Sequence, residues 1–252
     1  MVLCWAIVLF ILGAVVGSFL NVCIHRLPRE ESIVSPSSRC PHCRHAIAWY
    51  DNVPLFSYIF LRGSCRSCQE AIGGRYFLIE ALTAVMALFT YWKFGISLAF
   101  LAAFLFVATL IVITFIDIEH QIIPHEIVLP GIPIFLLAAV FIMRIPLFDA
   151  FLGIMVGIAS LYLVAVYYEQ ITGTEGMGGG DVNLMGMLGA FLGWQSLLFV
   201  LMTGAFTGAA VGIFMMIKSG KTMKYAVPFG PFLSLGAVIY LFWGRAILNF
   251  FP

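Results

Sequence analysis

Long apolar runs separated by short polar loops limit how this chain can fold. Hydrophobic residues make up 62% of the 252 residues and charged residues only 10%, against roughly 25% in ordinary soluble domains. A water-soluble protein of this size could not solvate so much apolar surface. Within a bilayer every backbone polar group must be bonded internally, and long apolar runs achieve this as helices. We therefore predict an all-α polytopic membrane protein.

The apolar runs predict eight transmembrane helices. They cover residues 3–23, 76–92, 96–116, 127–143, 148–168, 183–194, 196–217 and 226–243. The first run has neither a basic leader region nor a small-residue cleavage site followed by a polar domain, so we interpret it as a retained span. A full crossing needs about 20 apolar residues. Segment 183–194 is short for a crossing and could be a half-helix or a re-entrant piece.

Basic residues in the loops predict the orientation of the chain. Seven arginines lie in the polar stretch after the first span, and three lysines lie in the loop after the seventh. These ten are Arg26, Arg29, Arg39, Arg44, Arg62, Arg66, Arg75, Lys218, Lys221 and Lys224; the opposite side carries only Lys93, Arg144 and Arg245. The N-terminus is therefore expected outside and the basic loops in the cytoplasm. Asp117 and Asp181 follow the third and fifth spans, so both are expected at the cytoplasmic face.

Three parts of the chain follow from this topology. Residues 1–23 form the first transmembrane helix, residues 24–75 a cytoplasmic tetracysteine domain, and residues 76–252 a membrane core of about seven helices. The net charge of +1 gives no indication of a partner, and we expect no nucleic acid among the partners.

Four cysteines form two C-x-x-C pairs in the polar stretch. Cys40 and Cys43 make the first pair and Cys65 and Cys68 the second. Two such pairs can supply the four thiolates of a tetrahedral zinc site, which has no open position for water and is therefore structural. Two disulfides or four free thiols are the alternative, which a cytoplasmic location disfavours. His42 and His45 lie beside the first pair and are interpreted as surface residues rather than ligands.

Two aspartates lie where charge is costly, at the edge of apolar segments. Asp117 ends the third span, and a boundary acid solvated by lipid headgroups is the alternative to a catalytic role. Asp181 follows the glycine-rich stretch Gly176–Gly180. Glycines let a backbone adopt positive φ or approach another chain closely, which suits a substrate peptide lying beside a carboxylate. A flexible linker ending in a helix-capping aspartate is the alternative.

A pair of carboxylates at one membrane face suits acid–base hydrolysis. When two acids lie close together they cannot both ionise, so the pair shares one proton. The ionised member activates water and the protonated member polarises the scissile carbonyl. Neither phosphate-binding glycine pattern is present, and Ser18 with His25 lacks a third member and a nucleophile elbow.

These residues resemble a known family, the bacterial type IV prepilin peptidases, which are intramembrane aspartic peptidases. Gly178-Gly179-Gly180-Asp181 matches the family's G-x-G-D pattern. Further matches are residues 17–28, 75–80 and 228–233, Asp117 with Pro124, and the four cysteines. The chain departs from the common pattern mildly, with Gly179 at the variable position, Asn183 in place of a frequent lysine and Phe77 in place of a frequent proline.

The resemblance implies an activity and a location. Such enzymes cleave the short basic leader from prepilins and pseudopilins of type IV pili and type II secretion systems, between a glycine and a phenylalanine. They act at the cytoplasmic face of the inner membrane, and many then methylate the new N-terminal amine with S-adenosylmethionine. The resemblance implies Asp117 and Asp181 as catalytic residues, Gly178, Gly179 and Gly180 as a loop near the substrate, and zinc at the cysteines. Glu30, Glu31 and Glu80 are candidates for the methyl-donor site.

Two competing hypotheses remain at this stage. A transporter or channel could use Asp117 and Asp181 as a proton or cation site. It would predict ion flux and no cleavage, and it leaves the glycines and cysteines unexplained. A methyltransferase without peptidase activity would be unaffected by substitution of either aspartate.

Overall fold

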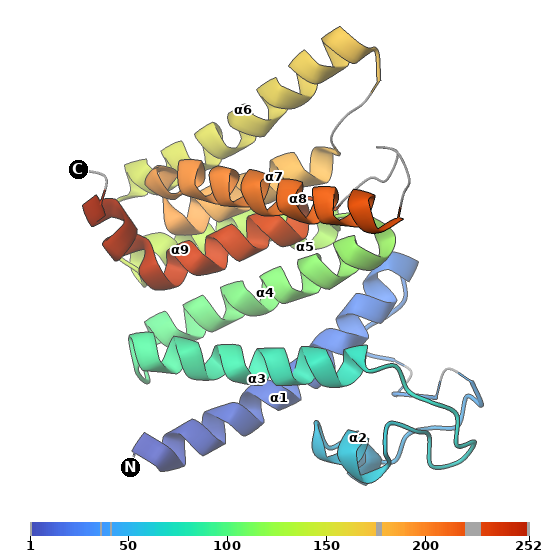
Figure 1. Cartoon of the computed structure of the whole chain (residues 1–252). Coiled ribbons are helices and arrows are strands. Elements are labelled where there is room, and N and C mark those ends of the chain that lie inside the picture. The colour runs from blue at the N-terminus through green and yellow to red at the C-terminus, as the bar shows by residue number, and fades with distance from the viewer. Residues whose placement is uncertain (1, 36, 41, 175–177, 220–227, 251–252) are drawn as a thin grey trace. The chain divides into compact units, whose positions relative to one another are not determined.

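A computed structural model gives the fold of the chain, and it describes residues 2–35, 37–40, 42–174, 178–219 and 228–250. The described residues form α helices and short 3-10 turns, with two isolated β-bridges in the cysteine segment (Figure 1). The long helices are α1 (Val2–Arg26), α3 (Arg75–Phe94), α4 (Leu98–His120), α5 (His125–Phe141), α6 (Leu147–Thr172), α7 (Gly179–Leu192), α8 (Leu197–Ser219) and α9 (Gly230–Phe250). The all-α prediction is confirmed, and each predicted apolar segment corresponds to one of these helices. The five-residue helix α2 (Phe56–Phe60), in the polar stretch, was not expected.

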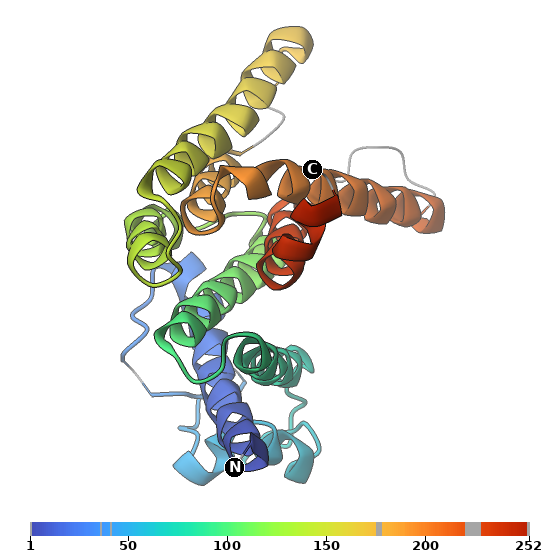
Figure 2. The same cartoon turned by 90° about the vertical axis from the view of Figure 1, so that its left-hand side faces the viewer.

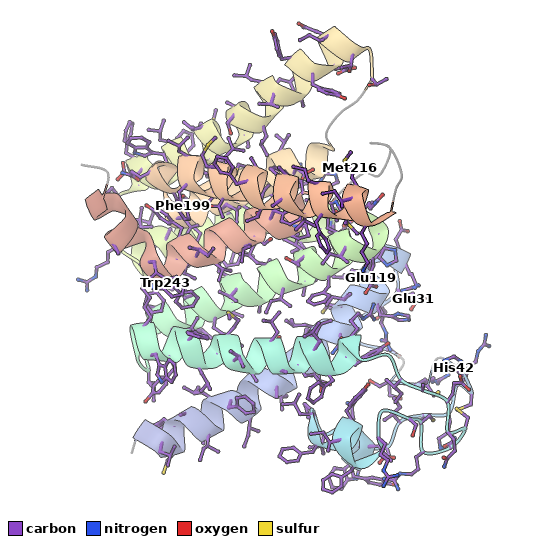
Figure 3. The ribbon with its side chains drawn as sticks, in the orientation of Figure 1. Glu31, His42, Glu119, Phe199, Met216 and Trp243 are labelled. Carbon is purple, nitrogen blue, oxygen red and sulfur yellow. The ribbon has the colours of Figure 1, made fainter. Side chains whose placement is uncertain are left out.

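Five of the described helices are long and apolar enough to cross a membrane. They are α1, α3, α4, α6 and α8, while α5 and the part of α9 up to Gly244 are shorter apolar helices. The outer faces of the helices carry many large apolar side chains, among them Met216 on α8 and Trp243 on α9 (Figure 3). A soluble protein would bury such residues, so the chain is a multi-pass membrane protein. The count of eight crossings stays a prediction. Helix α7 has only 14 residues, which at 1.5 Å per residue make a length of about 21 Å.

The chain divides into two compact units, Met1–Val112 and Ile113–Pro252, with the boundary inside α4. In the first unit α1 and α3 lie side by side (Figure 1). Gly13 and Gly17 form a G-x-x-x-G face on α1, and a Cβ at Gly13 would come within 2.8 Å of the Ala84 Cα on α3. A Cβ at Gly17 would come within 2.7 Å of the Glu80 Cα. These small residues let the two backbones approach, as expected for helices packed in lipid.

In the second unit α7 is packed against α5 and α6, and α8 pairs with α9 (Figure 2). The residues from Leu184 to Leu192 are all buried. Gly153 on α6 and Gly189 on α7 lie backbone to backbone, so that a Cβ on either would meet the carbonyl of the other. The short helix α7 is therefore enclosed by its neighbours, and its first turn, which carries Asp181, is held in place by them.

Candidate active site and metal centre

Asp117 lies in the last turn of α4 and is only 5% exposed. The backbone N–H of Gly230, the first residue of α9, donates a hydrogen bond of 2.9 Å to its Oδ2. A helix N-terminus presents unpaired N–H groups and partial positive charge, so this contact favours the ionised carboxylate. A Cβ at Gly230 would lie 2.7 Å from Asp117 Oδ2, so a larger residue at this position would displace the carboxylate. The backbone of α9 thus fixes the Asp117 carboxylate.

Asp181 lies in the first turn of α7, before the predicted segment 183–194 and outside the five helices long enough to span. Its Oδ1 is buried and has no hydrogen-bond partner. Burial, and secondly the negative charge of Asp117, raise the pKa of Asp181 to about 7. The negative charge of Asp117 therefore contributes to the environment of the Asp181 carboxyl. Asp117 has a backbone donor and Asp181 Oδ1 has none, so the pair is asymmetric.

Ile123 connects the helix ends that carry the two acids. It follows α4 and is 8% exposed. A Cβ at Gly180 would lie 2.8 Å from the Ile123 Cβ, and a Cβ at Gly230 would lie 3.2 Å from its Cδ1. Gly180 and Gly230 therefore pack directly on one side chain, and the contact at Gly180 leaves no room for a larger residue.

The glycines before Asp181 differ from one another. Gly178 and Gly179 are exposed, and a Cβ at Gly179 would meet nothing within 4 Å. Gly180 instead packs on Ile123. None of the three adopts positive φ, so close backbone approach, rather than an unusual backbone conformation, is what requires glycine at Gly180. Gly176 and Met177, which belong to the same motif, lie outside the described residues, as do Lys221 and Lys224 of the basic loop.

Asn183 lies one turn from the exposed glycines and contacts His125 at the start of α5, with 3.4 Å between Nδ2 and the imidazole Nδ1. Neither residue touches Asp117 or Asp181 by any hydrogen bond described. The contact links the first turns of α5 and α7 next to the acids.

The four cysteines converge in the first unit. Their sulfur atoms all lie within 4.8 Å of one another, and Cys40 Sγ and Cys68 Sγ are 3.8 Å apart. A tetrahedral zinc with Zn–S bonds of about 2.3 Å requires sulfurs separated by about 3.8 Å. None of the cysteines forms a disulfide, and the exposed His42 and His45 lie outside the cluster. The cluster can therefore bind a metal ion, and its geometry and donor atoms fit zinc.

The two cysteine turns are built alike. The N–H of Cys40 donates to the carbonyl of His45, and the N–H of Cys65 donates to the carbonyl of Glu70, each five residues on. The residues after the second cysteines, Arg44 and Gln69, both have positive φ. Each turn is also closed by a β-bridge, Arg39 with Ala46 and Ser64 with Ala71. Backbone N–H groups of Cys68 and Ser67 lower the pKa of the Cys65 thiol to about 6, which favours the thiolate that binds metal.

A cavity of about 270 Å³ lies between the cysteine segment and helices α1 and α3, all within the first unit. Glu80 lines it, but neither Glu30 nor Glu31 does. Glu31 lies beyond the end of α1, where it is exposed to solvent (Figure 3). Of the three acids considered for a methyl-donor site, only Glu80 therefore lines this cavity.

Comparisons with known proteins show the family of the chain. The description "Bacterial Peptidase A24 N-terminal domain" matches residues 11–94, and "Type IV leader peptidase family" matches residues 104–213. A protein of Pseudomonas aeruginosa named prepilin leader peptidase/N-methyltransferase is 37% identical over 94% of this chain and 90% of its own length. The chain belongs to the type IV leader peptidase family. Two further family members with the same name, from Aeromonas hydrophila and Dichelobacter nodosus, are each 36% identical and cover 96% and 94% of this chain, and 92% of their own lengths. No solved structure matches the chain.

Sequence reasoning did not single out three features of this structure. Gly230 belongs to a stretch noted only for its resemblance, and its hydrogen bond to Asp117 joins residues 113 positions apart. The G-x-x-x-G of Gly13 and Gly17 was a readable signal for close helix packing. Asn21, one turn beyond Gly17, was likewise noted only within a motif.

Proposed function

We propose that this protein is an aspartic endopeptidase that removes the leader peptide from type IV prepilins and pseudopilins, and that it N-methylates the new N-terminus. One observation carries the peptidase assignment. Asp117 is buried and bonded to the Gly230 N–H, and the negative charge of Asp117 acts on Asp181. The names of the curated relatives combine the same two activities.

The asymmetry of the pair assigns the two roles. Asp117, held by the Gly230 N–H, is the ionised member and takes a proton from the attacking water. Asp181 carries the shared proton and gives it to the carbonyl oxygen as the water oxygen bonds to the carbonyl carbon. When the tetrahedral species collapses, the C–N bond breaks, the proton on Asp117 passes to the leaving amine, and Asp181 regains its proton from the collapsing hydroxyl. Gly178 and Gly179 are exposed beside Asp181 and leave room for an extended substrate backbone.

Location and topology complete the proposal. We place the site at the cytoplasmic face, which the basic loops favour, of the bacterial inner membrane, which the family resemblance implies. Residues 24–75 form a zinc-binding domain, with Cys40, Cys43, Cys65 and Cys68 as ligands. Zinc would supply structural crosslinking there and no catalytic position. A transporter is not favoured, because the relatives are named as peptidases.

The methyl donor is S-adenosylmethionine, a cation that supplies an electrophilic methyl group. The cavity between the cysteine segment and helices α1 and α3 is the site we propose for it. Glu80 and Asn21 both line that cavity. Both groups fit a ligand that brings positive charge or hydrogen-bond donors.

Single replacement of each aspartate tests the peptidase. Asp117→Asn and Asp181→Asn should each reduce prepilin cleavage in membranes by roughly 10²- to 10⁴-fold, the usual contribution of general acid–base groups. Asp149→Asn, the same chemical change at the start of α6, is the matched control and should cleave normally. Near-wild-type cleavage by Asp117→Asn or Asp181→Asn would overturn the assignment. If either variant cleaved normally and lost only methylation, the aspartates would belong to a different class of enzyme.

A further inference from the structure

A patch of exposed aromatic and aliphatic side chains lies on the cysteine segment. Its exposed fractions run from 40% at Val53 to 83% at Trp49. Large apolar residues that gather on the surface of a polar domain mark a site of interaction. The members of this patch, which we call the aromatic patch, are Trp49, Tyr50, Val53, Phe56, Ile59 and Phe60.

Helix α2 turns its apolar side chains outward. At about 100° per residue, Phe56, Ile59 and Phe60 fall within about 100° of one another around the helix axis, and Tyr58 falls on the opposite side. The first three are more than half exposed. Tyr58 instead packs on Phe77 of α3, with 5.4 Å between the ring centroids. A surface helix of a soluble protein shows the reverse pattern, because its apolar stripe faces the core.

Trp49 and Tyr50 belong to the same surface as α2. The Ser57 hydroxyl donates to the carbonyl of Tyr50 at 3.0 Å and accepts from the N–H of Val53 at 3.1 Å. The Trp49 and Tyr50 rings meet edge to face, with centroids 5.7 Å apart. Helix α2 and the 3-10 turn Trp49–Asn52 therefore present their rings together.

Contacts to α3 place the aromatic patch at the level where that helix enters the membrane. The Leu55 N–H donates to Glu80 Oε2 at 2.8 Å, and Tyr58 contacts Phe77, so α2 lies beside the first turns of α3 (Figure 1). Helix α3 has 20 residues, and its length of about 30 Å equals the thickness of the hydrocarbon core. Its beginning at Arg75 therefore lies at the bilayer boundary. Phe77 and Glu80 lie about 3 Å and 7.5 Å further along the axis.

Two further features favour lipid over a protein partner. Leu78, next to Phe77 on α3, is 55% exposed, so exposed apolar surface continues on a membrane-crossing helix at the level of the patch. Arg62, two residues after α2, is exposed, as is Arg66, whose guanidinium lies 5.7 Å from the centroid of the Tyr50 ring. Tryptophan and tyrosine concentrate at membrane–water interfaces, and arginines beside them attract anionic headgroups.

We propose that the cysteine segment rests on the lipid bilayer, with the aromatic patch inserted at the boundary between headgroups and acyl chains and with Arg62 and Arg66 at the headgroup phosphates. A helix that lies in this way buries its apolar face about 5–10 Å deep, which matches the level set by Phe77 and Glu80. The segment is then a membrane-bound domain rather than one suspended in water by its two chain connections. This inference depends on neither of the proposed activities.

Quenching of tryptophan fluorescence locates the patch in the full-length protein, reconstituted in nanodiscs that contain anionic lipid. The chain has five tryptophans, so the emission of Trp49 is obtained as the difference between wild type and Trp49→Phe. It should be shifted to shorter wavelength, quenched by lipid brominated near the headgroup end of the acyl chains, and protected from iodide in the water.

Two results would overturn the proposal. Trp49 emission at the wavelength of solvated indole, quenched by iodide and not by brominated lipid, would show that the patch faces water. A shifted emission that neither quencher reaches would show that a second copy of the chain covers the patch.

A double substitution tests whether the patch itself makes the contact. Phe56→Ser with Phe60→Ser removes two side chains that are 59% and 81% exposed, so the core should be unaffected. The ratio of docked to free patch should fall roughly 100-fold, as expected from the burial of two phenylalanines, and Trp49 should become accessible to iodide. The control is Phe148→Ser with Phe151→Ser on α6, at residues 73% and 56% exposed, which should leave Trp49 unchanged.

Each double variant is measured against its own Trp49→Phe counterpart, and both should melt at the wild-type temperature. Unchanged quenching of Trp49 by brominated lipid in the Phe56 and Phe60 variant would overturn the assignment of the patch as the contact. If that variant proved unstable, the quenching of wild type would decide alone.

Discussion

Gly230→Ala should disable the peptidase without unfolding it. The added Cβ would lie 2.7 Å from Asp117 Oδ2 and 3.4 Å from its Cγ, so the carboxylate must move away from the backbone N–H that now bonds it at 2.9 Å. Alanine is a better helix former than glycine, and Gly230 does not use positive φ. The backbone of α9 should therefore tolerate the change.

The size of the effect follows from the lost hydrogen bond. A bond to a charged group is worth about 1.5–3 kcal/mol, and each 1.36 kcal/mol changes a rate tenfold. If the bond is lost and Asp117 is displaced, kcat should fall roughly 10- to 150-fold. KM should change little, since Gly230 is buried.

Purified protein and a prepilin substrate give kcat and KM separately. Gly74→Ala is the control, because a Cβ there would meet only the Tyr58 hydroxyl at 3.7 Å and the residue already has helical φ and ψ. A Gly230→Ala enzyme with a wild-type melting temperature and kcat within twofold of wild type would refute the role of the α9 backbone.

Three further predictions follow from the sites described. Because the pKa of Asp181 is raised to about 7 and the acid must be protonated to act, the cleavage rate should fall about tenfold per pH unit above that value. A cleavage rate that stays unchanged up to pH 9 would contradict this. Cys40→Ser should lower bound zinc and the melting temperature, with the exposed Cys4→Ser as control, and zinc-free wild-type protein by metal analysis would refute the metal site. Gly189→Ala should place a Cβ against the Gly153 carbonyl and destabilise the fold by about 1–3 kcal/mol; thermal unfolding at the wild-type temperature would show that α6 and α7 do not pack as described.

Much of the fold could be predicted from local sequence. Apolar runs located all eight long helices because lipid demands length and apolarity. They missed the last turn of α6, where polar Glu169 and Gln170 continue the helix to Thr172, and they missed α2, which has only five residues in a polar stretch. The cysteine cluster was predictable because its spacing is a local property of two turns.

The candidate active site was only partly predictable, for a physical reason. Loop charges could suggest that Asp117 and Asp181 share a membrane face, but they carry no information on which backbone would contact either acid. The bond from Gly230 and the packing of Ile123 on two glycines depend on tertiary contacts between distant segments. Such contacts follow from how helices pack, which periodicity and composition do not specify.

The repeated construction of the two cysteine turns has a consequence for assembly of that segment. Each turn contributes two of the four cysteine ligands, and Cys40 of the first turn approaches Cys68 of the second. A site with only two or three thiolates would bind metal weakly, although ordering the cysteine segment would cost nearly the same chain entropy. Loading should therefore be all-or-none, with intermediates scarcely populated. A cell short of zinc would then contain a mixture of fully ordered and fully disordered cysteine segments rather than a uniform, half-metallated population.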